Sequence, residues 1–333
     1  MKYLSDQNRA CFFYESGTYA LLSGARQWIG LVQNHDVESN MNVIPIRYQG
    51  STDRNVDAFA DGQIEWEGTL TYFPQDWKML GFAIGSITDL AGSHVMYETN
   101  TDNHAVPVSP AGYPGALSTI TIEDSKNLGF PTGSAFTRVL IGAMIDNYQL
   151  NFAQGEIVSA EIGYIAQAGS LNTSGVTALA ATTEKPFMFS DVSLQIGSRT
   201  TMGNGLVNNL KEGTFSINNN LERGFYLNGS RTVKELLPMN RDYEVTATCD
   251  MDTLNVGSLY QNYYIAGSEF NSTLNIFSSA TSTGSLIVVM SGCKMTDMTI
   301  PSVLEGVQEQ TFTFVPQHIE GMAMDAIGSY NYN

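Results

Sequence analysis

Two stretches of the chain alternate apolar and polar residues with the period of a half-buried β-strand. The apolar positions are Ile64, Trp66, Leu70 and Tyr72 in the first stretch and Tyr243, Val245, Ala247 and Cys249 in the second. Side chains two residues apart point to the same face of a strand. We therefore predict that each stretch is a strand with one face in a core and one polar face.

The flanking sequences indicate that these strands belong to an internal repeat. Residues 37–51 (VESNMNVIPIRYQGS) align with residues 215–230 (FSINNNLERGFYLNGS) at a sequence offset of 179 (229 minus 50), which places Asn40 on Asn219 and Glu65 on Glu244. Residues 138–166 align with 286–315 at an offset of 150 (292 minus 142), and the equivalent pairs there are Gly142 and Gly292, Tyr148 and Met298, Leu150 and Ile300, Ile162 and Phe312, and Tyr164 and Phe314. Blocks in the same order and phase predict a domain duplication, with chance similarity as the alternative.

Turn-rich and helix-like segments then define the expected boundaries. The predicted parts are an N-terminal arm (1–29), a first β domain (30–167) with a loop insertion (87–118), a linker (168–185), a second β domain (186–316) and a C-terminal tail (317–333). Each domain contains a short helix-like segment, at 74–86 with Pro74 in its first turn and at 252–268 with Asp252 as N-cap. Many short strands and few helices predict a mainly β fold, with an antiparallel β-sandwich or partly open β-barrel in each domain.

Composition sets further limits. The 333 residues are 43% hydrophobic and 15% charged, which is typical of a folded chain, and the length favours two domains. The formal net charge of -17, with no basic patch, argues against tight nucleic-acid binding. No apolar run approaches the roughly 20 residues that span a bilayer, and the N-terminus does not resemble a secretion signal. We therefore expect a protein that is made in the cytoplasm and has no membrane partner.

Signals of catalysis or metal binding are weak. The three cysteines are far apart, and the four histidines are never spaced as ligands on one helix face, so we expect small hydrophobes and surface residues respectively. Glu65 and Glu67 could form a glycosidase-like acid pair, but a solvated strand face explains them as well. Asp53, Asp57 and Asp61 lack the glycine and terminal glutamate of a calcium loop. With no nucleophile elbow or phosphate-binding loop in the sequence, we expect no enzyme activity, cofactor or metal.

Residues 28–57 (WIGLVQNHDVESNMNVIPIRYQGSTDRNVD) and 68–86 (GTLTYFPQDWKMLGFAIGS) resemble the first domain of a tail tube protein of long-tailed bacterial or archaeal viruses, and residues 216–248 resemble a second such domain. The resemblance implies small β-barrels or sandwiches, each with a flanking helix, that self-assemble into stacked rings of six domains. Two domains per chain then imply a homotrimeric, pseudo-hexameric ring. Implied partners are further copies of the chain, tape-measure, terminator and baseplate proteins, and viral DNA that passes during ejection without tight binding. The implied location is the virion tail.

A bore-facing strand surface should be polar in both domains. We expect this surface to consist of Glu65, Glu67, Thr69, Glu244, Thr246 and Thr248; an outer solvated face is the alternative. The arm, the insertion and the tail are candidates for contacts between rings. Alternative functions are a tail terminator or baseplate tube component, or a carbohydrate-binding or carbohydrate-hydrolysing β-protein.

Overall fold

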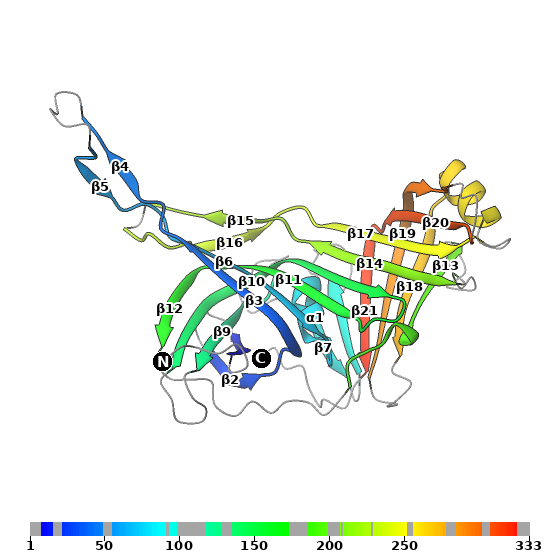
Figure 1. The fold of residues 1–333 in the computed structure, drawn as a ribbon, viewed down its shortest axis with the longest axis horizontal. Helices are drawn as coiled ribbons and strands as arrows, with labels where there is room; N and C mark the ends of the chain where they lie inside the picture. The colour runs from blue at the N-terminus through cyan, green and yellow to red at the C-terminus, as the bar shows by residue number, and fades with distance from the viewer. Residues whose placement is uncertain are drawn as a thin grey trace.

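The structure is a computed structural model in which the described residues are 8–15, 22–48, 55–90, 93–98, 117–127, 135–172, 185–198, 207, 209–227, 229–251, 256–277, 284–301 and 307–324. These residues form a mainly β fold, as the alternating pattern predicted (Figure 1).

One antiparallel sheet runs through both halves of the chain, and we call it the shared sheet. Its strands lie in the order β3 (Leu31–Asn40), β6 (Glu65–Phe73), β11 (Ser159–Ala166), β10 (Ala135–Ala153), β14 (Leu210–Asn218), β17 (Asp242–Asp250), β20 (Glu309–Val315) and β19 (Ser285–Thr299). The first and second halves of the chain meet where β10 pairs with β14.

A second sheet flanks each half, and the long strands β10 and β19 belong to both sheets. The first flanking sheet has the order β2 (Leu22–Gln27), β1 (Asn8–Glu15), β9 (Ile120–Asn127), β10 and β12 (Ala168–Asn172). The second has the order β13 (Val192–Ser198), β18 (Phe270–Phe277), β19, β21 (His318–Met324), β8 (Ser93–Glu98) and β7 (Gly85–Leu90).

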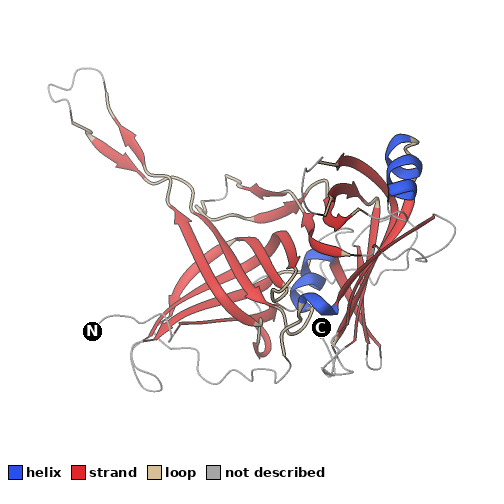
Figure 2. Cartoon of the chain, turned by 45° about the vertical axis from the view of Figure 1, so that its right-hand side comes forward, coloured by secondary structure: helices blue, strands red, loops and turns tan. Residues whose placement is uncertain are grey.

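Short helices and two hairpin tips complete the fold. The helices are α1 (Lys78–Ile84), the 3-10 turn η2 (Phe189–Asp191) and the π-helix η3 (Val256–Ile265). The first hairpin tip consists of β4 (Ile44–Ile46) and β5 (Ala58–Ala60), and the second of β15 (Leu221–Gly224) and β16 (Glu235–Pro238). In Figures 1 and 2 the β4–β5 hairpin projects away from the body of the chain.

The core lies between the shared sheet and the flanking sheets. It is one continuous apolar cluster that draws on both halves, including Leu70 and Tyr148 from the first and Val245 and Phe312 from the second. Helix α1 is entirely buried in it, and Trp77 stacks on Phe187 with ring centroids 4.8 Å apart. Burial of such large aromatic side chains dominates the energetics of a core.

Long-range strand pairing recruits segments that lie outside the two expected domains. The predicted arm (1–29) contributes β1 and β2, and Phe12 of β1 is fully buried. The expected loop insertion (87–118) contains strand residues of the β7–β8 hairpin, and most of the remainder lies outside the described residues. Strand β12 falls in the predicted linker and β21 in the predicted tail.

The two helix-like segments are helical, with different starts from those expected. Helix α1 begins at Lys78 after Trp77, so Pro74 does not occupy its first turn. The second segment forms η3, and the proposed cap Asp252 lies outside the described residues.

The two halves repeat their strand geometry. Gly142 in β10 and Gly292 in β19 have positive φ angles of 65° and 61°, and in each strand the register to its partner shifts shortly afterwards, at 145–147 and at 295–297. The two glycines have the offset of 150 (292 minus 142) at which the sequence alignment placed them. Asn42 and Asn220 likewise share φ angles of 43° and 47°, at an offset of 178 (220 minus 42).

The strand registers change one predicted equivalence. Gly68 of β6 lies opposite Tyr164, and Val245 of β17 lies opposite Phe314, so β6 and β17 correspond at an offset of 177 (245 minus 68). Glu67 therefore matches Glu244, where the sequence alignment had placed Glu65. A slip of two positions preserves the face of a strand, so the prediction of which side is polar is unaffected.

Candidate functional site

The side of the shared sheet that faces away from the core is polar across both halves, and we call it the polar face. One row of neighbouring residues crosses it from β11 to β19 and consists of Ser159, Asn151, Thr214, Thr246, Thr313 and Asp297. Residues directly opposite each other on antiparallel strands share a face. The row therefore continues without interruption through the β10–β14 junction.

The six residues predicted to face a bore all lie on the polar face. Glu67, Thr69 and Glu244 are exposed, Glu65 and Thr246 are half-buried, and Thr248 is buried. They alternate with core residues such as Leu70 and Val245. The structure thus brings the six together on one surface.

Hydroxyl pairs tie neighbouring strands together on this face. Thr246 and Thr313 lie 3.1 Å apart between their Oγ1 atoms, and Thr248 and Thr311 lie 3.0 Å apart. Cross-strand threonine pairs of this kind stabilise a sheet. They also present methyl and hydroxyl groups without net charge in the middle of the face.

Charge on the polar face is mainly negative. Arg223 is paired with Glu67, and Nζ of Lys211 lies 2.7 Å from Asp250 and 2.6 Å from Glu309. Hydrogen bonds to these two acids raise the pKa of Lys211 to about 12. Among the described residues no basic side chain pairs with Glu38, Glu161 or Glu244.

Both ends of the shared sheet keep an unpaired strand edge within the described part of the chain. At one end, β3 pairs with β6 on one side only. At the other end, residues 297–299 of β19 pair only with β20. An unpaired edge presents backbone N–H and C=O groups to another strand.

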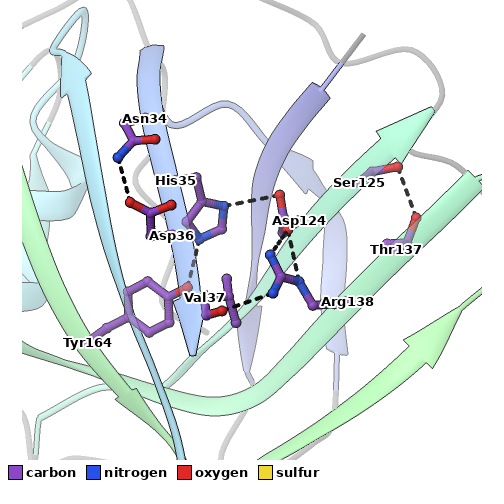
Figure 3. Close-up of polar contacts among 9 residues, drawn as sticks. All are labelled: Asn34, His35, Asp36, Val37, Asp124, Ser125, Thr137, Arg138 and Tyr164. Atoms are coloured by element: carbon purple, nitrogen blue, oxygen red, sulfur yellow. Dashed lines mark hydrogen bonds and ion pairs between the residues drawn. The ribbon is translucent and has the colours of Figure 1, made fainter. Parts of the chain in front are cut away.

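A buried polar cluster supports the β3 edge from behind (Figure 3). Nε2 of His35 lies 2.7 Å from the hydroxyl of Tyr164, and its Nδ1 lies 3.5 Å from Asp124. Arg138 donates to Asp124 at 2.6 and 3.0 Å and to the backbone oxygen of Val37 at 2.9 Å. The cluster connects β3 to the first flanking sheet.

Burial and pairing set the protonation of this cluster. Burial alone would raise the pKa of the Asp124 carboxyl, but hydrogen bonds and charges from His35 and Arg138 outweigh it and hold that pKa below its usual value. Burial raises the pKa of the Tyr164 hydroxyl, and the nearby Asp124 charge raises it further. The cluster therefore holds an ionised carboxylate between a guanidinium and an imidazole.

The sequence interpretation missed this cluster and expected surface histidines. His35 and His94 have buried side chains, His318 is exposed, and His104 lies outside the described residues. One feature of the sequence could have indicated that His35 is buried. It lies two residues before Val37, which packs against the core, and residues two apart lie on the same side of a strand.

Other kinds of site find no support in the described part of the chain. There, no three His, Cys, Asp or Glu side chains come together as a metal site requires. A search of the same residues for a long apolar helix that could cross a bilayer finds none. The cysteines Cys11, Cys249 and Cys293 are all free and buried.

The described residues form a mainly β fold with one polar face that extends over both halves. Residues 48–316 match the family described as phage tail tube protein, and the chain belongs to that family. Phage tail tube proteins are structural components of the virion tail and are not enzymes.

Two solved structures with low sequence identity and low TM-scores illustrate the structural comparison. One is the SPP1 tail tube, determined by solid-state NMR and cryo-EM, with 11% sequence identity and a TM-score of 0.33 over 42% of this chain and 81% of that chain. Another is the acyl-CoA thioesterase II TesB2 from Mycobacterium marinum, with 9% identity and a TM-score of 0.11 over 75% of this chain and 99% of that chain. A comparison with curated proteins gives no match.

Proposed function

We propose that three copies of the chain close head to tail into a ring, that rings stack into the tail tube, and that the polar face lines the bore through which viral DNA passes. The chain would arise from a duplicated tube domain, so that each ring contains six similar halves. Tape-measure, terminator and baseplate proteins would be its partners in the tail.

The pairing of β10 with β14 carries this proposal. Within the shared sheet it joins the edge strand of the first half to the edge strand of the second, over the pairs from Asn147 with Asn218 to Ala153 with Glu212. The corresponding strands at the ends of the sheet are β19 and β3, and each has a free edge among the described residues. A second chain could therefore repeat the internal junction at each end.

The repeated geometry specifies the register of that contact. Gln149 lies opposite Ser216. Position 149 of β10 corresponds to 299 of β19 at the offset of 150, and position 216 of β14 corresponds to 38 of β3 at the offset of 178. The equivalent contact between chains therefore places Thr299 of one chain opposite Glu38 of the next. Met298 would then lie opposite Ser39, and Asp297 opposite Asn40. Because Pro301 has no N–H to donate, the ladder between chains should be shorter than the internal one.

A head-to-tail contact closes into a ring only when its rotation divides the full circle. Six halves per ring, the number that the family resemblance implies, are supplied by three chains. Closure would also leave the shared sheets without free edges, which removes the hazard of uncontrolled strand addition.

The chemistry of the polar face suits passage of DNA. Unpaired acids repel phosphates, whereas clustered lysines and arginines would hold them by counterion release. The face is lined by similar side chains in both halves, such as Thr69 and Thr246 or Glu67 and Glu244. A carbohydrate site would instead concentrate aromatic residues and acids in one half.

A disulfide placed at the predicted junction tests the ring. The backbone N–H of Asn219 donates to the backbone oxygen of Asp146 at 2.7 Å, so these two residues form a hydrogen-bonded pair. Hydrogen-bonded and non-hydrogen-bonded pairs alternate along an antiparallel ladder. Asn147 with Asn218, and two residues further on Gln149 with Ser216, are therefore non-hydrogen-bonded pairs. Such pairs have Cα atoms about 4.5 Å apart, within the range that a disulfide bridges. The Glu38→Cys/Thr299→Cys variant should therefore cross-link between chains after assembly.

The matched control is Gln149→Cys/Ser216→Cys, which places the same pair at the internal junction. This control should oxidise within one chain and leave the apparent size unchanged under denaturing conditions. Full oxidation of the junction variant should stop at covalent trimers, with rings or tubes visible in negative stain. A ladder longer than three chains, or oxidation of the control pair alone in assembled tubes, would exclude the closed trimer.

A further inference from the structure

The β4–β5 hairpin exposes an unusual number of large apolar side chains. The exposed residues are Met41, Val43, Ile44, Ile46, Tyr48 and Phe59, and Phe59 is 68% exposed. The hairpin extends well beyond the sheets (Figures 1 and 2). Large apolar side chains exposed together on a projecting element indicate a docking site.

The chain itself contains a docked counterpart. The β15–β16 hairpin of the second half packs on the first half, where Val233 and Leu236 form a buried cluster with Leu117, Met144 and Ile165. Backbone contacts reinforce this packing, because Ile64 N donates to Arg231 O at 2.8 Å. Ile165 and Met144 are opposite each other on β11 and β10.

The two hairpins correspond residue by residue. In each, an asparagine side chain accepts a hydrogen bond from the backbone of the residue two positions later at 3.0 Å, Asn40 for Asn42 and Asn218 for Asn220. The pair of Ile44 and Ala60 in the first hairpin corresponds to the pair of Glu222 and Leu237 in the second. The offset is therefore 178 (222 minus 44) for the first strand of each hairpin and 177 (237 minus 60) for the second. On that basis Val43 matches Leu221, Val56 matches Val233, and Phe59 matches Leu236.

The receiving surface also has a counterpart in the second half. At the offset that relates Gly142 to Gly292, Ile165 corresponds to Val315 and Met144 to Lys294, and these two face each other on β20 and β19. Val315 is exposed although its counterpart Ile165 is buried beneath a hairpin. Its exposure leaves an apolar position uncovered where the first half has a covered one.

We infer that the β4–β5 hairpin of one chain docks on the second half of the neighbouring chain in the same ring, with Val43 and Phe59 over Val315 and the aliphatic stem of Lys294. This inference rests on the proposed ring, since the same neighbour supplies both β19 and the receiving surface. The occupant is therefore a second copy of this chain.

The contact between chains should be more apolar than the internal one. Inside the chain, the buried Asn219 donates to Ala83 O and Ile145 O, and Arg241 donates to Ile84 O. The equivalents of Asn219 and Arg241 in the first half are Met41 and Ile64. The contact between chains thus has apolar side chains where the internal contact has the hydrogen bonds of Asn219 and Arg241. Before assembly, these apolar side chains leave no hydrogen-bond donor unsatisfied.

Cross-linking of Phe59→Cys/Val315→Cys with a short bismaleimide tests this docking. The native thiols will not compete, because all three are buried and burial raises the pKa of Cys293 to about 12. In assembled tubes the cross-linked product should stop at trimers. A ladder beyond three chains would show that the hairpin contacts another ring and would overturn the inference.

The Glu38→Cys/Thr299→Cys junction variant separates the two proposals. If that variant yields trimers while the Phe59→Cys/Val315→Cys variant yields none, the docking inference fails and the ring stands. If neither variant cross-links in assembled tubes, both fail.

A second variant measures the contribution of the hairpin. Val43→Ser/Phe59→Ser should leave the melting temperature of the unassembled chain unchanged, since both side chains are exposed there. The concentration needed for assembly should rise about tenfold or more, because the change removes two apolar side chains from the contact. Unchanged assembly would overturn the inference.

Discussion

Arg241 donates from Nε to the side-chain oxygen of Asn219 at 2.7 Å, and this pair fastens the second half of the chain to helix α1 of the first. Asn219 is 1% exposed and donates its amide group to Ala83 O and Ile145 O at 3.1 and 2.9 Å. Every polar atom of the Asn219 side chain is therefore used at the junction between the halves.

Replacing Asn219 with alanine should destabilise the chain by about 1–3 kcal/mol, because the change leaves the Arg241 Nε donor and two buried carbonyls short of a partner. Urea unfolding of the unassembled protein would measure the loss. Gln149→Ala, an exposed change on the polar face, is the control and should stay within about 0.5 kcal/mol of wild type. Equal stability of the two variants would show that the hydrogen bonds of Asn219 contribute nothing to the free energy of unfolding.

A second prediction concerns the close approach of Gly68 to Tyr164. These residues are directly opposite on β6 and β11, and a Cβ atom at position 68 would overlap the Tyr164 hydroxyl and lie 2.7 Å from Asp36 O. Gly68→Ala should therefore displace Tyr164 from His35 and destabilise the chain by about 1–3 kcal/mol.

A double-mutant cycle identifies the cause. Tyr164→Leu removes both the hydroxyl and the ring carbon Cζ that the new methyl group would meet, so in that background Gly68→Ala should cost less than it does alone. Additive losses in thermal unfolding would mean that the strain comes from the backbone contact with Asp36 instead.

Local sequence pattern predicted the strand phase and the polar side of the sheet, because period-two alternation reports burial directly. It could not predict which segments join which sheet. Strand β1 depends on a partner that is distant in the sequence, since Cys11 lies opposite Glu123. Val95 of the expected loop similarly depends on Met322. Composition cannot reveal such distant pairings.

The same limit explains the errors within the candidate site. Glu67 and Glu65 are equally plausible matches for Glu244 by residue type, and only the strand registers decide between them. His35 resembles a surface residue until β9 brings Asp124, itself paired with Arg138 of β10, against it. The sheet edges that carry the proposed function are properties of the whole topology, and no single motif encodes them.

The Asp124 cluster predicts acid sensitivity. The folded pKa of Asp124 is lowered despite its burial, because His35 and Arg138 stabilise the carboxylate. Its contribution is thus fully present above the unfolded pKa of about 3.9 and is lost as pH falls through the lower folded value. Urea midpoints measured between pH 7 and pH 3 should decrease for wild type toward the acid end.

Asp124→Asn removes the titrating group and should flatten that acid limb while lowering stability at pH 7, because Arg138 keeps only a neutral partner. Asp242→Asn, at an exposed position of the polar face, should leave the limb unchanged. An acid limb that is as steep in Asp124→Asn as in wild type would assign the sensitivity to other carboxyls.

The proposal that the polar face lines the bore is tested by adding positive charge to that face. Thr246→Lys would place one cation per chain in the middle of the polar face, next to Thr214 and Thr313. Tubes of this variant should retain short DNA that wild-type tubes release, and retention should weaken steeply with added salt as counterion release requires. Retained DNA should resist nuclease, because the tube wall would enclose it. Ser170→Lys adds the same charge at an exposed position of the first flanking sheet and should give no protected DNA. Protection that is equal in the two variants, or absent in Thr246→Lys tubes of normal shape, would place the polar face outside the bore.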